Sequence, residues 1–178
     1  MILPEPYKRF YKTHLRFALV MIVVALLAGI CFQESAKKVH ITQAVPVGAH
    51  LEYILSLALL HGHVFLVCVL VPLACTWMLH LTLVLGLGSV SGRSLGWSTA
   101  LYLPGAILTV LLMLLKGYHL VLGVRHGALD FNTLNASFLT PALRGAGYGL
   151  AHALMGAGLG VLVVALFRSM GGVSVARH

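Results

Sequence analysis

The sequence contains little charge and few acidic residues. Only 9% of its 178 residues are charged and four are Asp or Glu, whereas a soluble domain is about 25% charged. Hydrophobic residues make up 60% of the chain. This composition excludes a water-soluble protein. The sequence also lacks an HExxH motif, a phosphate-binding loop and a Ser/His/Asp pattern, so hydrolytic machinery, and enzymatic activity in general, are not expected.

Cysteine is scarce and its spacing excludes one kind of cofactor site. The chain has three cysteines, and they form neither a CxxC pair nor a CxxCH motif. A covalently attached haem c is therefore excluded. Cys68 and Cys75 lie in an apolar run, where small packing residues are expected.

The chain contains long hydrophobic runs. Four runs stand out, approximately 15–32, 51–85, 96–122 and 143–167, and each can supply the roughly 20 residues that cross about 30 Å of hydrocarbon. Apolar spans of this length are helical because each backbone group must find a partner within its own segment. We predict an all-α, transmembrane four-helix bundle that forms a single domain over 1–178.

The basic residues indicate a topology and not a nucleic-acid partner. The net charge is +8, but Lys8, Arg9 and Lys12 precede the first run, Arg93 follows the second and Arg168 follows the fourth. The positive-inside rule then places both the N and C termini in the cytoplasm. The partner predicted from composition is the lipid bilayer.

The fourth run carries a histidine among small residues. On a regular helix, His152 shares one face with Gly145, Gly149, Gly156 and Gly160. Two small-xxx-small repeats of this kind let a neighbouring backbone approach closely, so we expect this face to point into the protein. In the simpler interpretation the glycines serve packing alone and His152 donates a hydrogen bond to a carbonyl.

A polar stripe follows one face of the third run. It comprises Tyr102, Gly105, Thr109, Met113, Lys116 and His119. Lys116 has two interpretations. It could snorkel to the interface, or, beside His119 and Arg125, it could bind an anion such as a haem propionate or a lipid phosphate.

The second run contains a His-Gly-His sequence. His61 and His63 lie about 200° apart on a regular helix, so they cannot chelate one ion together. At a uniform helical step His61 shares a face with Cys68 and Pro72, which favours His61 as the inward histidine. Gly62 and Pro72 could distort this helix.

Ionisable residues converge in the half of the bundle predicted to face outward, namely His61, His63, Lys116, His119 and His152. Imidazoles on facing helices can hold a cofactor, and haem b needs one or two histidines, an apolar slot and a cation for its propionates. The predicted ligands are His61 or His63 opposite His152, with Lys116 or Arg125 as the cation. Electron transfer or redox or haem sensing would follow.

Other functions remain open at this stage. A copper or zinc site could use His61, His63 and His152 with Glu34 or His119. A cofactor-free accessory or assembly subunit of a larger membrane complex could satisfy its histidines by internal hydrogen bonds. A transporter or proton relay is a third class, although four helices make a small pathway unless the protein forms a homo-oligomer.

Four motifs together resemble a known family. The order ICFQE, HGHVFLV, LTVLLMLLKGYHLVLG and GYGLAHALMGAGLG resembles a family of bacterial four-helix membrane proteins known only as a domain of unknown function. The resemblance implies the same fold in the bacterial inner membrane. It singles out Glu34, His61, His63, Lys116 and His152. His119 departs from the family pattern, which has glutamine near this position.

The His-x-His motif is also similar to a helix in the catalytic subunits of haem-copper oxidases and nitric-oxide reductases. This chain lacks the remaining helices and ligands of those enzymes, so their oxygen chemistry does not carry over. A redox partner or a larger membrane complex is the protein partner expected for a small cytochrome-like protein.

Overall fold

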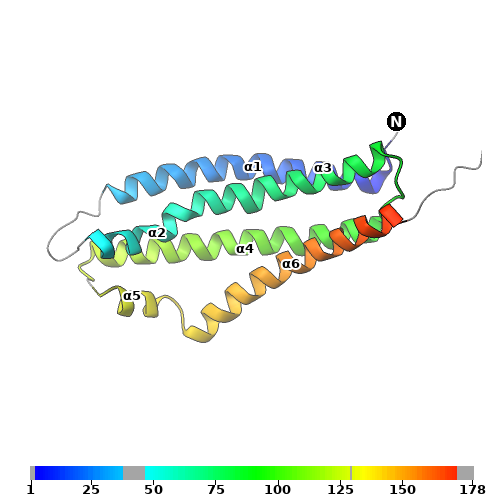
Figure 1. Cartoon of the computed structure of the whole chain (residues 1–178). Helices are drawn as coiled ribbons and strands as arrows, with labels where there is room; N and C mark the ends of the chain where they lie inside the picture. Colours follow the sequence, from blue (N-terminus) through cyan, green and yellow to red (C-terminus); the bar gives the residue numbers. More distant parts are fainter. Residues whose placement is uncertain (1–2, 38–46, 129, 172–178) are drawn as a thin grey trace, which may run out of the picture.

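The computed structural model describes residues 3–37, 47–128 and 130–171, and its regular elements there are helices (Figure 1). In chain order these are α1 (Glu5–Ala36), α2 (Val47–His63), the π-helix η1 (Val64–Leu70), α3 (Val71–Val84), α4 (Gly92–Arg125), α5 (Phe131–Ser137) and α6 (Pro141–Gly171). Four spans are long and apolar enough to cross a membrane: α1, the continuous α2–η1–α3 rod, α4 and α6. The predicted all-α, transmembrane four-helix bundle is confirmed.

The helix α1 begins earlier than the first apolar run. It starts at Glu5 and not near Leu15, with Pro4 as the preceding residue and Pro6 in the first turn. Proline is compatible with a first helical turn, because the N–H groups there have no partner within the helix. The N-terminal basic residues are consequently helical.

The four spans do not pack as a closed square. The helices α1, α2–η1–α3 and α4 lie side by side, whereas α6 crosses α4 obliquely and its N-terminal half diverges from the others (Figure 1). The α4–α6 contact is the most extensive in the described chain, and α6 also touches α3, but α2 and α6 have no extended contact. The bundle is therefore open between α2 and α6.

The crossing of α4 and α6 depends on two glycines that face each other's helix. A Cβ added to Gly158 would lie 2.6 Å from the Tyr102 backbone nitrogen, and one added to Gly105 would lie 2.8 Å from the Ala151 carbonyl oxygen. Real Cβ atoms do not come this close, so only glycine permits the approach. Small residues at helix contacts are typical of membrane proteins.

The glycine face predicted to make this contact does not make it. A Cβ added at Gly145, Gly149, Gly156 or Gly160 would find nothing within 4 Å, and all four are exposed. The prediction that this face packs against a neighbouring helix of the bundle is wrong. The buried face of α6 lies elsewhere on its circumference, because contact is decided by the partner surface on α4 as well as by small residues on α6.

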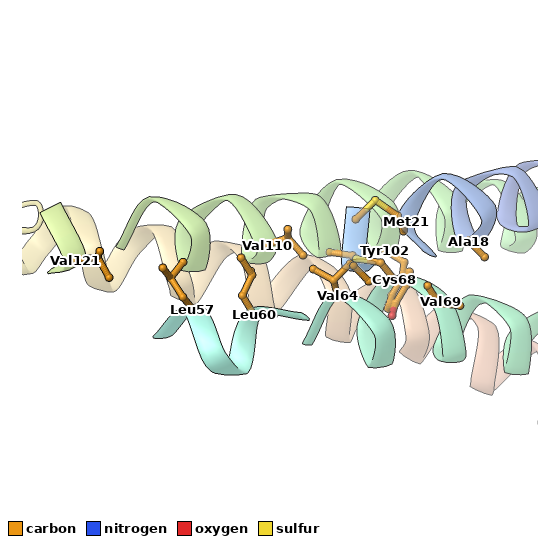
Figure 2. Close-up of a cluster of buried hydrophobic side chains, with 12 residues drawn as sticks. Ala18, Met21, Leu57, Leu60, Val64, Cys68, Val69, Tyr102, Val110 and Val121 are labelled. Carbon is orange, nitrogen blue, oxygen red and sulfur yellow. The ribbon is translucent and has the colours of Figure 1, made fainter. Parts of the chain in front are cut away.

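The main core joins α1, the α2–η1–α3 rod and α4 (Figure 2). Val64 and Cys68 are fully buried, and Leu60 is almost so. Cys75 is buried in a second cluster near the N-terminal end of α1. Cys68 and Cys75 thus lie among apolar side chains, as predicted for packing residues.

The π-helix η1 coincides with a missing backbone donor. The Val71 N–H reaches back five residues to the Leu66 carbonyl, and the next bond in that pattern would join residue 72 to Val67. Pro72 has no N–H to give. The Tyr102 hydroxyl of α4 instead donates to the Val67 carbonyl oxygen at 2.6 Å. The distortion expected near Pro72 is present, and a side chain from another helix satisfies the freed carbonyl.

Tyr102→Phe is expected to lower the free energy of unfolding by about 1–3 kcal/mol, because it leaves a carbonyl without its donor in an apolar interior. Tyr11→Phe is the matched control, since the Tyr11 hydroxyl is buried without a hydrogen-bond partner among the described residues. That substitution should be neutral or stabilising. Equilibrium unfolding in mixed micelles measures both, and equal losses would contradict the role of the Tyr102–Val67 bond.

Candidate cofactor-binding groove

The opening between α2 and α6 forms a groove of about 340 Å³ with α4 as its floor. We call it the α2/α6 groove. Its lining residues are Leu55, Ser56, Leu59 and His63 of α2, Thr109, Met113 and Lys116 of α4, and Tyr148 and His152 of α6. The volume is within the range of ligand pockets, about 300–1,000 Å³. Three of the residues singled out from the sequence, His63, Lys116 and His152, therefore meet in one place.

His63 of α2 is half-buried and His152 of α6 is exposed, contrary to the prediction that His152 points into the protein. The two rings line this groove from different helices and make the same kind of backbone hydrogen bond. The His63 Nδ1–H donates to the Leu59 carbonyl oxygen at 3.0 Å, and the His152 Nδ1–H donates to the Tyr148 carbonyl oxygen at 2.7 Å. A carbonyl oxygen only accepts, so the proton of each neutral imidazole belongs on Nδ1. The Nε2 lone pair of each ring is then available to a ligand, the arrangement typical of metal-ligating histidines.

The same backbone bond occurs at His14, which does not line the α2/α6 groove. The His14 Nδ1–H donates to the Phe10 carbonyl oxygen at 3.0 Å, and this ring is stacked on Phe10 and almost fully buried. The Nδ1 bond alone is therefore a local feature of helical histidines. What distinguishes His63 and His152 is that their rings line one cavity from two helices.

Lys116 supplies the positive charge of the α2/α6 groove. Its side chain is half-buried, and within the described residues its ammonium makes no hydrogen bond or ion pair. It lies one turn from Met113 toward the end of α4 that carries α5. The predicted polar stripe on α4 faces the protein interior. Tyr102, Gly105 and Thr109 are buried, and Met113 and Lys116 continue the stripe along the groove floor.

His61 faces away from the α2/α6 groove, contrary to the expectation that it is the inward histidine. It is exposed, its ring is stacked on Phe32 of α1 with centroids 6.3 Å apart, and it lines a separate apolar pocket beside Ala25. The expectation assumed a uniform turn per residue from His61 to Cys68. The π-helix turns less per residue, so burial of Cys68 no longer brings His61 inward.

His119 and Arg125 do not line the groove either. The His119 Nε2 lies 3.0 Å from the Leu134 carbonyl oxygen and 3.0 Å from the Ser137 hydroxyl. His119 therefore ties α5 to α4, a structural contact. Arg125 is exposed at the last turn of α4.

The short helix α5 begins with an N-cap, Asp130. Asp130 accepts hydrogen bonds from the Asn132 N–H at 3.0 Å and from the Thr133 side chain. The Thr133 bond, followed by the Asn132 bond, lowers the pKa of the exposed Asp130 carboxyl. With Leu134 buried against Leu120, α5 packs against the end of α4.

The residues considered for copper or zinc are not brought together. Glu34 pairs with Lys37 at 2.6 Å and does not line the groove, and His61 lies on the other side of α2. Over the described ranges, no three His, Cys, Asp or Glu side chains form a group that could hold a metal ion. Of the set His61, His63, His152 and Glu34, the α2/α6 groove is lined by His63 and His152 and not by the other two.

Tyr148 lines the groove and was not singled out from the sequence. It precedes His152 by one helical turn in GYGLAHAL, and its carbonyl orients the His152 ring. The i, i+4 spacing of an aromatic and a histidine was the available signal. Tyrosine suits the edge of such a site because it offers an apolar ring and one hydroxyl.

These features define a multi-pass, four-helix membrane protein with a histidine-lined groove between two of its helices. Comparison of the chain with protein-family models, with curated proteins and with solved structures finds no match. The functional interpretation therefore rests on the chain's own residues.

Proposed function

We propose that the α2/α6 groove binds haem b between His63 and His152. The observation that carries this proposal is the pair of imidazoles that line one groove from α2 and α6, each with its Nδ1–H donated to its own helix, which leaves the Nε2 lone pair for a ligand. Haem b requires one or two such nitrogens from the protein. A bound haem would supply reversible one-electron chemistry at its iron.

The remaining groove residues suit the other parts of a haem. Leu55, Leu59 and Met113 provide apolar surface for a macrocycle. The Lys116 ammonium would pair with a propionate, and that pair would offset the cost of a half-buried charge. Axial ligand identity, burial and nearby charge are the means by which a protein sets a haem potential.

A bare metal ion fits these residues less well. Zinc sites use at least three protein ligands, whereas the groove offers the two histidines His63 and His152 and no third His, Cys, Asp or Glu among its lining residues. Haem brings four nitrogens of its own and needs no third side chain. The proposed role is electron transfer or redox or haem sensing in the inner membrane, with a redox partner or larger membrane complex.

An absorption spectrum tests the proposal directly. Protein purified in mild detergent from haem-replete cells should show a Soret band, which shifts on reduction with dithionite, and haem near one per chain in a pyridine haemochrome assay. Absence of a Soret band would refute the proposal. If elemental analysis also found no copper or zinc, a cofactor-free accessory subunit would be the better description.

A further inference from the structure

A second groove lies at the opposite end of the molecule, between the N-terminal turns of α1 and α4. Its volume is about 500 Å³, and we call it the α1/α4 groove. Its main lining residues are Arg9, Phe10 and Thr13 of α1 and Leu95, Gly96 and Thr99 of α4. It contains no histidine and has no part in the proposed haem site.

The mouth of the α1/α4 groove is strongly basic. Arg9 and Thr13 also line an adjoining cavity of about 410 Å³ with Lys8, Lys12 and Arg16. Glu5 is the acidic residue there, and it pairs with Lys8 at 3.7 Å. In the described part of the chain, Arg9, Lys12 and Arg16 form no ion pair. The site thus carries an excess of positive charge.

The length of α1 places these cations at the level of lipid headgroups. Its 32 residues span about 48 Å at 1.5 Å per residue, against about 30 Å of hydrocarbon. The apolar part of α1 begins near Leu15, so the turns that carry Lys8 and Arg9 lie in the headgroup region, and Thr13 lies at the edge of the hydrocarbon. Since α1 and α4 both enter the bundle from this end (Figure 1), the groove runs from Arg9 inward to Thr99 and Ala100.

The inner part of the groove is open and apolar. A Cβ added at Gly96 would find nothing within 4 Å, whereas one added at Gly92, nearer the mouth, would meet Pro6 at 3.0 Å. The two helices therefore touch at the mouth and leave space beside Gly96. Phe10 and Leu95, both almost fully buried, are the large apolar residues of its lining.

We propose that the α1/α4 groove binds an anionic phospholipid, with its headgroup phosphate at Arg9 and Lys12 and one acyl chain beside Leu95 and Gly96. Basic pockets between transmembrane helices on the cytoplasmic side bind anionic headgroups. The positive-inside rule accounts for cations on this side of the membrane, but not for an apolar slot that continues below them. A bound lipid would fill the space between α1 and α4.

Native mass spectrometry of the delipidated full chain tests this proposal, with phosphatidylglycerol and phosphatidylcholine titrated separately. We expect tighter binding of phosphatidylglycerol. Arg9→Gln should weaken that binding about fivefold, the effect of one basic residue at a headgroup. Gly96→Leu should weaken it at least as much by filling the acyl slot, with every charge unchanged.

Two variants control for diffuse attraction and for general effects of a larger side chain. Arg93→Gln removes a cation at the same end but outside the groove lining, and Gly29→Leu adds bulk at a glycine that also has nothing within 4 Å. Neither should change phosphatidylglycerol binding. Equal effects of Arg9→Gln and Arg93→Gln, no effect of Gly96→Leu, or equal binding of the two lipids would overturn the proposal. Competition by glycerol 3-phosphate at the same concentration would also overturn it, since the site would then recognise a free anion.

Discussion

Gly158→Ala is expected to lower the free energy of unfolding by about 1–3 kcal/mol, the usual cost of overpacking a close contact. The added Cβ would lie 2.6 Å from the Tyr102 backbone nitrogen and 2.9 Å from the Ser98 carbonyl oxygen. Backbone atoms cannot rotate away as a flexible side chain can, so α4 and α6 must separate. Gly158→Leu should have a larger effect, with loss of the oblique crossing that keeps the α2/α6 groove open.

The controls for this prediction lie on the same helix. Gly156→Ala and Gly160→Ala introduce a Cβ with nothing within 4 Å, and alanine is favoured over glycine in a helix by about 0.8–1.0 kcal/mol. These variants should be neutral or slightly stabilising. Equilibrium unfolding in mixed micelles, followed by circular dichroism, separates the two outcomes. A destabilising Gly156→Ala with a neutral Gly158→Ala would mean that the sequence-predicted glycine face makes the contact after all.

His63→Ala is expected to reduce retained haem more than about tenfold, whereas His61→Ala should leave it unchanged. Loss of a group that only hydrogen-bonds to a metal ligand costs about 10–100-fold in affinity, so loss of a ligand itself should cost more. The two histidines are separated only by Gly62 on one helix, but His63 lines the α2/α6 groove and His61 lines the pocket beside α1. His152→Ala should match His63→Ala.

The measurement is the haem-to-protein ratio of variants purified in parallel, with far-ultraviolet circular dichroism to confirm that each is folded. His14→Ala is unsuitable as a control because His14 is buried, so its truncation would leave a cavity. Lys116→Gln should retain both ligands and lower the reduction potential, since a nearby cation favours the reduced haem. Haem loss in His61→Ala with retention in His63→Ala would contradict the assignment.

The fold class could be predicted from the sequence because the length and apolar composition of one segment decide whether that segment spans a membrane as a helix. A run such as 96–122 is long and apolar enough to require a helix whatever surrounds it, and α4 contains it. The stripe from Tyr102 to Lys116 was also predictable, because α4 is regular over this stretch and a constant turn per residue keeps its polar side chains on one face.

The residue types of the site could be predicted from the sequence. Which histidine of α2 shares the groove with His152 could not. The sequence by itself determined that His63, Lys116 and His152 are ionisable groups at similar depth in an apolar bundle, where such groups are costly. Only the tertiary structure decided that His63, and not His61, lines the same groove as His152. The reason is physical: the π-helix beyond His63 changes the turn per residue, and the contact at Gly158 fixes the angle at which α6 leaves α4. The π-helix and the crossing angle both depend on atoms of a second helix. The hydrophobic periodicity of a single segment therefore cannot predict them.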